Sequence, residues 1–241
     1  MVTLSIVIPA RNESENIVAL VDAIHRSVEP LGPFEIIVVD DGSTDATAAV
    51  LRNRQKTMPE LRLLQHPMSA GQSAGVHTGA LAAKGSIICT LDGDGQNPPE
   101  DIPNLIAPLM AAGSDKIGLV AGQRVGRKDT LSKRLASRFA NGLRSWMLGD
   151  KTRDTGCGLK AFRRDAFLRL PYFNHMHRYL PALFARDGWQ VRHVDVGHRA
   201  REAGKSNYSN LQRGLVGIVD LFGVAWLIQR KKKAEAMPED R

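Results

Sequence analysis

The strongest constraint on the fold is a series of short apolar runs separated by segments with helical periodicity. Five such runs occur in the first half of the chain, at residues 4–8, 34–39, 61–65, 86–91 and 116–122. Apolar runs that alternate with helical segments are typical of β-α-β units, which build a mostly parallel sheet. The sequence therefore predicts an α/β fold. One more strand is expected in DGWQVRHVDVGHRA, residues 187–200.

Two of the intervening segments carry signals for the start of a helix. ENIVALVDAIHRS places its apolar residues on one helical face, and Ser14 precedes it as a candidate N-cap. In DATAAVLRNRQ the expected cap is Ser43 or Thr44, with Asp45 in the first helical turn. Short polar side chains accept hydrogen bonds from the free N–H groups of a first turn, and a carboxylate there is favourable.

Length and composition limit the class of protein. The chain has 241 residues and is 43% hydrophobic, which suits one large domain or one domain with an appendage. The two cysteines lack the spacing of a disulfide framework or a metal site, so we expect a reducing compartment. The apolar run at the N-terminus is too short for a signal peptide and follows no basic leader. We therefore expect the protein in the cytoplasm.

The net charge of +8 points to an acidic partner. Nucleic acid, phosphorylated small molecules and an anionic membrane surface are the three candidates. Only 5% of residues are aromatic, and the sequence contains neither a stacking platform nor a recognition motif for nucleic acid. These features argue against nucleic-acid binding.

Polar loops follow three of the predicted strands: PARNE, DDGSTD and DGDGQ. Ligands bind at the carboxyl ends of the strands in such sheets, so the three loops mark one candidate site. In the third loop Asp92 and Asp94 are separated by one glycine and can ligate a hard divalent cation, with Gln96 as a polar neighbour. Mg²⁺ usually keeps coordination positions for substrate phosphates. The alternative is a plain turn, because Asp-Gly pairs are common turn formers.

SAGQSAG, residues 69–75, superficially resembles a glycine loop that binds phosphate. It lacks both the GxGxxG spacing of dinucleotide-binding proteins and the lysine of P-loops. We expect instead that Gly71 and Gly75 allow close packing beside a nucleotide pocket.

Five segments occur in an order known from one family: SIVIPARNESENI, IIVVDDGSTDAT, GQSAGVHTGALAAKGSIICTLDGDGQNPPEDIP, DTGCGLKAFRR and REAGKSNY. Together they resemble the family 2 glycosyltransferases, specifically the dolichyl- or polyprenyl-phosphate sugar transferases. The resemblance implies a GT-A fold, with a Rossmann-like, mostly parallel sheet flanked by helices, over residues 1–208. Residues 209–241 are expected to form an interfacial helix and a basic tail.

The resemblance also assigns roles to residues of the three loops. It places these residues at the nucleotide, the last two near the base or ribose: Pro9, Ala10, Glu13, Asp40 and Asp41. It assigns binding of Mg²⁺ or Mn²⁺ and of the diphosphate to Asp92, Asp94 and Gln96. Carboxylates can accept hydrogen bonds from a base or ribose, and a metal must offset their repulsion of a diphosphate. For Asp40 and Asp41, a purely structural role in the DDGSTD turn is a compatible alternative.

The implied reaction transfers a hexose from a nucleoside-diphosphate sugar to an acceptor, with inversion. The metal neutralises charge on the departing diphosphate, so Asp94 is a catalytic candidate. A polyprenyl phosphate acceptor is already ionised and needs no general base. A hydroxyl of a glycolipid or saccharide would need one, and Asp154 is then the first candidate. A nucleotide-sugar-binding regulator without turnover is the alternative of another class, and the intact acidic pair argues against it.

Basic loop residues favour the phosphate acceptor, because guanidinium groups can bind phosphate oxygens with two hydrogen bonds. The candidates are Arg124, Arg199, Arg201 and Lys205, of which Arg124 is assigned to catalysis. HRAREAGKSNY resembles the lid of the family and matches it at Ser206 and Tyr208, whereas Asn207 stands where lysine is common.

The segment NHMHRYLP is a further candidate for acceptor binding. The resemblance puts His177 and Arg178 near the acceptor. His175 and His177 could instead belong to a second metal site, but no third ligand lies near in the sequence. An ordinary surface loop is the other alternative.

Two segments indicate contact with a membrane. LSKRLASRFANGLRSWML has an apolar helical stripe and basic residues elsewhere, a pattern of interfacial helices, although a helix packed on the core is the alternative. Residues 214–228 are apolar except for Asp220 and lead into RKKK, but a bilayer crossing needs about 20 residues. We therefore expect a peripheral enzyme at the inner face of the cell membrane. The sequence indicates neither the donor base and sugar nor the oligomeric state.

Overall fold

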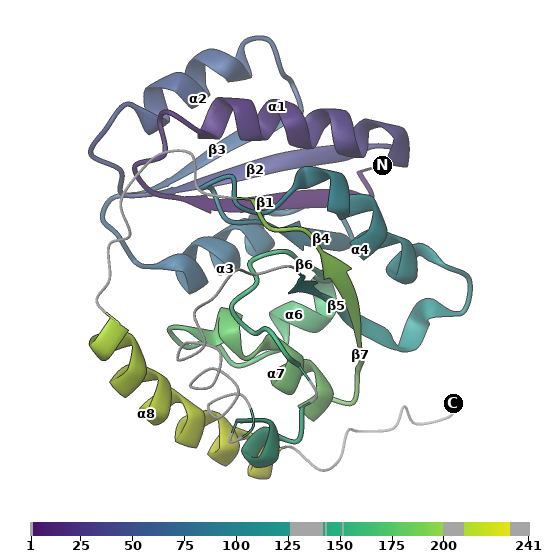
Figure 1. The fold of residues 1–241 in the computed structure, drawn as a ribbon. Coiled ribbons are helices and arrows are strands. Elements are labelled where there is room, and N and C mark those ends of the chain that lie inside the picture. Colours follow the sequence, from purple (N-terminus) through teal and green to yellow (C-terminus); the bar gives the residue numbers. More distant parts are fainter. Residues whose placement is uncertain (1, 126–141, 143, 151, 200–209, 232–241) are drawn as a thin grey trace, which may run out of the picture.

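The computed structural model describes residues 2–125, 142, 144–150, 152–199 and 210–231, with side chains of the last segment described from residue 217. Its strands form a single seven-stranded sheet in the order β3-β2-β1-β4-β6-β5-β7 (Figure 1). The strands are β1 (Leu4–Ala10), β2 (Phe34–Asp41), β3 (Leu61–His66), β4 (Ile87–Thr90), β5 (Ile117–Arg124), β6 (Lys160–Arg163) and β7 (Gln190–Val196). The mostly parallel sheet and all six strands expected from the sequence are confirmed.

Strand β6 was not expected. It lies between β4 and β5 and runs antiparallel to both, while the other strand pairs are parallel. Only Ala161 and Phe162 are apolar among its four residues, so it has too little pattern to be recognised. Both are fully buried, because the strand is covered on both faces.

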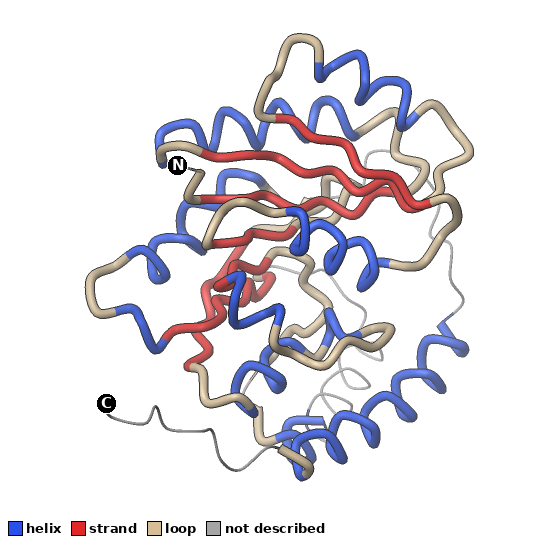
Figure 2. The backbone as a smooth tube through the Cα atoms, turned by 180° about the vertical axis from the view of Figure 1, so that it is seen from behind, coloured by secondary structure: helices blue, strands red, loops and turns tan. Residues whose placement is uncertain are grey.

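Helices cover both faces of the sheet, as the front and back views show (Figure 2). One layer contains α1 (Ile17–Val28), α2 (Thr47–Gln55) and α4 (Ile102–Met110). The other contains α3 (Gln72–Ala82), α6 (Arg164–Leu168), α7 (Leu180–Arg186) and α8 (Asn210–Gln229). Short 3₁₀ turns complete the described elements: η1 (Glu29–Leu31), η2 (Pro99–Asp101), η3 (Ser114–Lys116) and η4 (Met176–Arg178).

The core is divided by the sheet because successive strand residues point to opposite faces. In β1, Ile6 and Ile8 belong to the core under α1, whereas Val7 belongs to the core under α3. Apart from Ser5, the strand is apolar because both of its faces are covered.

The predicted helix caps are wrong. Helix α1 begins at Ile17, three residues after Ser14, and has no side-chain cap. Before α2, Asp45 accepts hydrogen bonds from the backbone N–H and the hydroxyl of Thr47, at 2.9 and 2.6 Å. Ser43 accepts a hydrogen bond from the N–H of Asn12, at 2.9 Å. It therefore joins the loops after β1 and β2 instead of capping the helix.

Helix α3 lies close to β1 because it carries glycines where the two meet. A Cβ on Gly75 would lie 2.8 Å from the Cβ of Pro9, and one on Gly79 would overlap Val7. The expected close packing is therefore present at Gly75. Gly71 has another role: no atom lies within 4 Å of its Cβ position, and its φ of +90° is a conformation that favours glycine.

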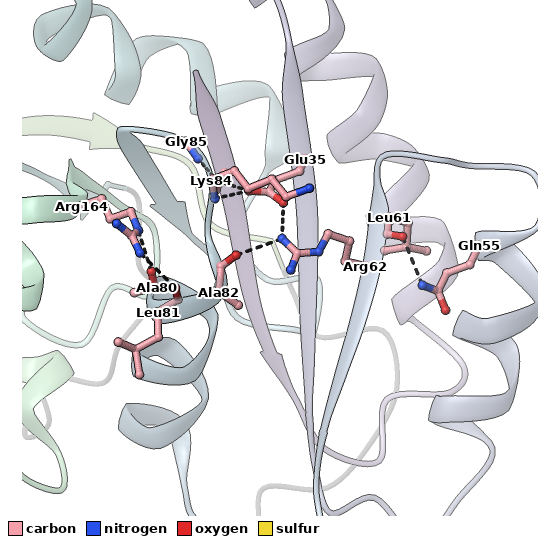
Figure 3. A network of polar contacts seen from close by, with 11 residues as sticks. Glu35, Gln55, Leu61, Arg62, Ala80, Leu81, Ala82, Lys84, Gly85 and Arg164 are labelled. Carbon is pink, nitrogen blue, oxygen red and sulfur yellow. Dashed lines mark hydrogen bonds and ion pairs between the residues drawn. The ribbon is translucent and has the colours of Figure 1, made fainter. Parts of the chain in front are cut away.

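A polar network fixes the amino-terminal edge of the sheet (Figure 3). The Glu35 carboxylate on β2 accepts hydrogen bonds from the hydroxyl of Ser5 at 2.7 Å, the N–H of Lys84 at 2.6 Å and the guanidinium of Arg62 at 2.5 Å. Arg62 also donates to the carbonyl oxygen of Ala82, at 3.0 Å. The network joins β1, β2, β3 and the segment between α3 and β4.

No helix in the described part of the chain combines the length and apolar character needed to cross a bilayer.

Candidate active site

The carboxyl ends of β1, β2 and β4 bring the three polar loops to one edge of the sheet, as the parallel topology predicts. Strand β6 is antiparallel, so its amino-terminal end reaches the same edge. Lys160, its first residue, lies opposite Thr90 on β4 and Ala121 on β5. The segment preceding β6, which contains Asp154, is therefore delivered to the site.

Asp92 and Asp94 form the acidic centre of the site. The Asp92 carboxylate accepts hydrogen bonds from the side-chain amides of Gln72, at 2.5 Å, and Asn97, at 3.4 Å. Asp94 accepts a hydrogen bond from the N–H of Gln96, at 3.1 Å, which closes the turn. Desolvation and the nearby charge of Asp94 raise the pKa of Asp92. A bound cation would relieve this repulsion.

Glycines set the position of the acidic loop. A Cβ on Gly158 would overlap the Asp92 carboxylate, so this carboxylate occupies the space that a side chain would take. A Cβ on Gly93 would lie 3.1 Å from the Cβ of Ala10 and 3.2 Å from the carbonyl oxygen of Pro9. The Asp92–Asp94 turn therefore packs against the end of β1, where two of the predicted nucleotide-binding residues lie.

The acidic pair fits a cation that shares its coordination with a substrate. Mg²⁺ and Mn²⁺ take oxygen ligands, and one or two carboxylates with substrate phosphates and water are a common arrangement for Mg²⁺. In the described residues no group of three or more His, Cys, Asp or Glu side chains could form a closed metal centre. A second metal site at His175 and His177 has no support, because His175 pairs with Asp220, at 3.1 Å, and His177 contacts Ser73, at 2.8 Å.

The carboxylate of Asp41 is saturated by contacts within the protein. It accepts four hydrogen bonds of 2.7–2.8 Å, from the ring of His66, the hydroxyl of Ser69 and the N–H groups of Ala70 and Gly71. Burial raises the pKa of Asp41, but these hydrogen bonds outweigh it and lower the pKa. These contacts support the alternative that Asp41 has a structural role in the DDGSTD turn.

Asp40 and Glu13 also have partners in the neighbouring loops. Asp40 accepts hydrogen bonds from the N–H of Ser43, at 3.0 Å, and the amide of Gln65, at 3.1 Å. Glu13 is 8% exposed, and its carboxylate accepts a hydrogen bond from Asn16, at 3.0 Å. These contacts order the two loops that border the acidic centre.

Arg124, at the end of β5, binds the Asp154 carboxylate with two hydrogen bonds of 2.6 and 2.9 Å. The pairing with Asp154 outweighs desolvation and raises the pKa of Arg124. The two hydrogen bonds commit both carboxylate oxygens of Asp154 to Arg124 and fix the orientation of the guanidinium.

A small cavity lies beside the acidic centre. Its polar lining comes from Gln72, Thr90, Lys160 and His177, and the remaining lining from Pro9, Val76, Leu91, Gly158 and Leu180. The ring of His177 contacts the hydroxyl of Ser73, which links η4 to α3. Desolvation and the charges of Lys160, Arg178 and His175 lower the pKa of His177 well below 6.5, so its ring is neutral near pH 7.

The remaining candidates for acceptor binding are either exposed, adjacent to His177 or outside the described residues. Arg199 is exposed and pairs with Glu100 at 2.9 Å, while its backbone N–H donates to the carbonyl oxygen of Gln96 at 3.0 Å. Arg178 lies in η4 next to His177. Arg201, Lys205, Ser206 and Tyr208 lie outside the described residues, as does most of the amphipathic stretch 131–148.

Four residues at the acidic centre were not predicted: Gln72, Asn97, Gly158 and Lys160. Gln72 and Asn97 hold Asp92, and Gly158 gives it room. Lys160 is 3% exposed although its side chain is charged. Its one sequence signal is a lysine directly after the glycine-containing segment DTGCGL, which becomes informative only when β6 is known.

The chain matches known proteins over most of its length. Residues 5–170 match glycosyl transferase family 2. A dodecaprenyl-phosphate galacturonate synthase of Rhizobium johnstonii is 35% identical over 238 residues, covering 95% of this chain and 68% of that protein. An undecaprenyl-phosphate 4-deoxy-4-formamido-L-arabinose transferase of Pectobacterium carotovorum subsp. carotovorum is 34% identical over 212 residues, covering 87% of this chain and 63% of that protein. The chain therefore spans only about two thirds of either relative.

Solved structures share the fold. A mannosyltransferase from Pyrobaculum calidifontis, in complex with GDP-Man and Mn²⁺, has a TM-score of 0.68 at 23% identity over 96% of this chain and 65% of that one. Glucosyl-3-phosphoglycerate synthase from Mycobacterium tuberculosis, in complex with Mn²⁺, uridine-diphosphate and phosphoglyceric acid, has a TM-score of 0.65 at 22% identity over 94% and 78% of the two chains. The predicted GT-A fold is confirmed. The chain belongs to glycosyl transferase family 2.

Proposed function

We propose that this protein transfers a sugar from a nucleoside-diphosphate donor to a polyprenyl phosphate, with inversion and with the help of Mg²⁺ or Mn²⁺. The acidic pair Asp92 and Asp94, at the edge where the nucleotide loops meet, is the observation that carries the proposal. Two relatives are named for transfers involving dodecaprenyl and undecaprenyl phosphate, which supports a lipid phosphate acceptor. Their names specify galacturonate and a formamido-arabinose, so the sugar is not restricted to a neutral hexose.

The chain supplies positioning and charge to this reaction. Asp92 and Asp94 would hold the cation, and the cation would stabilise the negative charge of the departing diphosphate. Gln72 and Asn97 keep the Asp92 carboxylate in place. Asp154 holds the guanidinium of Arg124 in a fixed orientation. An arginine held in this way is suited to bind a phosphate oxygen.

The ion pair of Asp154 also favours a phosphate acceptor over a hydroxyl acceptor. A hydroxyl must lose a proton as it attacks, whereas a phosphate monoester is ionised near neutral pH. Asp154 is the first candidate for the general base, but both of its carboxylate oxygens already accept hydrogen bonds from Arg124. Attack by an ionised phosphate requires no such base.

Helix α8 supports a location at a membrane surface. Its inner face packs on the core through Leu221 and Val224. Its outer face exposes Ile218, Val219, Phe222 and Trp226, which are 55–71% exposed. Basic residues follow directly, beginning with Arg230 and Lys231. An apolar helix face with an aromatic residue and a cationic end fits a bilayer that contains anionic lipids.

The direct test is metal-dependent transfer of label into a lipid product. The protein is incubated with undecaprenyl phosphate, Mn²⁺ and labelled donors that include UDP-galacturonate, UDP-glucose and GDP-mannose, and label in the organic phase is counted. We expect transfer from at least one donor, and a loss of at least about 100-fold for Asp94→Asn, because one charge ligand of the cation is removed.

The matched control is Asp115→Asn, which removes the same charge from an exposed position in η3. It should retain wild-type activity. Metal-independent transfer, or full activity of Asp94→Asn, would show that the acidic pair does not have the proposed role. Binding of donor without any transfer would instead favour the regulatory alternative.

A further inference from the structure

Lys160 is a charged side chain enclosed by the protein. It is 3% exposed, and its ammonium group donates a hydrogen bond to the carbonyl oxygen of Cys157. Among the described residues no carboxylate lies within ion-pair distance of it. A carbonyl oxygen satisfies one N–H group but carries only a partial charge. Within the described part of the chain, the positive charge of Lys160 therefore has no anionic partner in direct contact.

Other enclosed cations near the site differ from Lys160 in this respect. Arg124 pairs with Asp154 at 2.6 Å, and Arg144 pairs with Asp150 at 2.5 Å. Burying a charge without a partner is energetically costly, so such groups are normally paired. Desolvation lowers the pKa of Lys160, and the charges of Asp92 and Asp154 oppose this shift without cancelling it.

Lys160 lines the cavity beside the acidic centre together with Gln72, which holds Asp92, and with His177, which is fixed by Ser73. Pro9, near the end of β1, forms another part of the wall. The cavity has room for about one water-sized group, so a single phosphate oxygen, but not a whole ligand, could reach Lys160 there. Such an oxygen would lie between the nucleotide loop, the cation site and the predicted acceptor residue.

We propose that Lys160 binds a phosphate oxygen of the substrate beside the divalent cation. This inference rests on the proposed function and adds a residue that the sequence analysis did not assign. A phosphate oxygen would supply the full negative charge that the carbonyl of Cys157 lacks. Two groups could provide it: the diphosphate of the donor and the phosphate of the lipid acceptor. Both have the chemistry that a buried ammonium recognises.

The proposal predicts two effects of opposite sign for Lys160→Met. Phosphate binding weakens because a charge-assisted hydrogen bond is lost, and we expect a decrease in affinity of about tenfold or more. Mn²⁺ binding in the absence of substrate becomes tighter, by about fivefold, because a positive charge near the acidic pair is removed. A residue that only supports the fold would weaken both ligands or affect neither.

The experiment measures the two ligands separately. Mn²⁺ affinity of the substrate-free protein is followed by electron paramagnetic resonance. Binding of UDP and GDP at saturating Mn²⁺, and of farnesyl phosphate without metal, is measured by calorimetry. Loss confined to the nucleoside diphosphates assigns Lys160 to the donor, and loss confined to farnesyl phosphate assigns it to the acceptor. Lys160→Arg retains the charge and should keep Mn²⁺ affinity near the wild-type value.

Arg163→Met is the matched control. Arg163 lies at the other end of β6 and also binds backbone carbonyl oxygens, those of Ile117 and Ser114, at 2.9 and 3.0 Å. Its replacement removes a cation from the same strand and should change neither affinity. Unchanged binding of both phosphates by a folded Lys160→Met protein would overturn the inference. If the wild-type protein binds neither nucleoside diphosphate nor Mn²⁺, the proposed function itself fails.

Discussion

At the scale of single residues, Gly158 determines where the Asp92 carboxylate can lie. A methyl group at position 158 would overlap this carboxylate, which is the end of a movable side chain. We therefore expect Gly158→Ala to displace the carboxylate and leave the backbone in place. Displacement of a reacting or ligating group by about 1 Å can cost about 100-fold in rate. The predicted result is a loss of transfer activity of that order, measured at saturating Mn²⁺.

Thermal unfolding separates this effect from a loss of stability. Gly158→Ala should unfold within a few degrees of the wild-type protein while losing activity. Gly217→Ala, where no atom lies within 4 Å of the added methyl group, should change neither property. Wild-type activity of Gly158→Ala would show that Asp92 does not need this position.

The residues of the site differ in how far the sequence revealed them. Asp92 and Asp94 were predictable because their signal is local: two carboxylates around a glycine, directly after an apolar run. Gln72 acts on Asp92 from 20 positions away, so its role depends on the fold. The internal saturation of Asp41 was also hidden, because it requires the loop after β3 to return to the end of β2.

At the scale of elements, the network around Glu35 joins three strands at the edge opposite the site. Burial raises the pKa of Glu35, but hydrogen bonds from Lys84, Arg62 and Ser5 outweigh it and lower the pKa below 4.5. A lowered pKa in the folded state stabilises the protein above the pKa of the unfolded chain. This contribution is lost as the pH falls through the folded value.

We therefore expect Glu35→Gln to decrease the free energy of unfolding by about 2 kcal/mol at pH 7, because hydrogen bonds to a charged group are weakened. The difference from wild type should begin to narrow as the pH falls below about 4.5, where Glu35 of the unfolded chain becomes protonated, and should continue to narrow as the pH falls through the lower pKa of the folded protein. Denaturant unfolding at pH 7 and pH 3.5 measures both values. Glu60→Gln, which affects a 3.8 Å contact with His25 at the surface, should cost much less. If the free energies of unfolding of Glu35→Gln and wild type differed by the same amount at both pH values, the stabilising role of the ionised Glu35 carboxylate would be contradicted.

Helix α8 has an element-scale prediction of its own. Phe222 is 63% exposed, so Phe222→Glu should leave the fold intact and weaken binding to vesicles of anionic lipid by about tenfold, since apolar area no longer enters the interface. Gln229→Glu adds the same charge at another exposed position and should have a smaller effect. Vesicle co-sedimentation at two salt concentrations measures both. Equal binding of Phe222→Glu and wild type would exclude this helix face from membrane contact.

The elements were predicted unequally for physical reasons. The central strands β1, β2 and β5 are largely apolar and buried because helices cover both of their faces, and this pattern is visible in the sequence. Strand β6 has only four residues, and its pairing with β4 and β5 depends on contacts distant in sequence. Because β6 was not predicted, the position of its first residue, Lys160, could not be predicted either. The prediction of Ser43 as a cap is wrong because its hydroxyl accepts a hydrogen bond from Asn12 in the loop after β1, while Asp45 binds Thr47 at the start of α2.

At the scale of the whole molecule, the site joins parts of the chain that are far apart in sequence. The loops after β1, β2 and β4 and the segment before β6 meet at one edge, and a ligand there would contact several of them at once. A ligand that binds only the folded state at 100 times its dissociation constant stabilises it by about 2.7 kcal/mol. For a chain of this size, that corresponds to roughly 5–10 °C in the melting temperature.

We expect the full increase only when Mn²⁺ and a nucleoside diphosphate are present together, because in the proposed function Asp92 and Asp94 would hold the cation and the cation would offset the charge of the diphosphate. Each ligand alone should raise the melting temperature less, and chelation of the metal should reverse the gain. Asp94→Asn should lose the cooperative part while unfolding near the wild-type temperature without ligands. Differential scanning fluorimetry with each ligand separately and with both provides the measurement. Strictly additive increases would mean that metal and diphosphate bind at independent places, and the site would then not be the single centre inferred from its geometry.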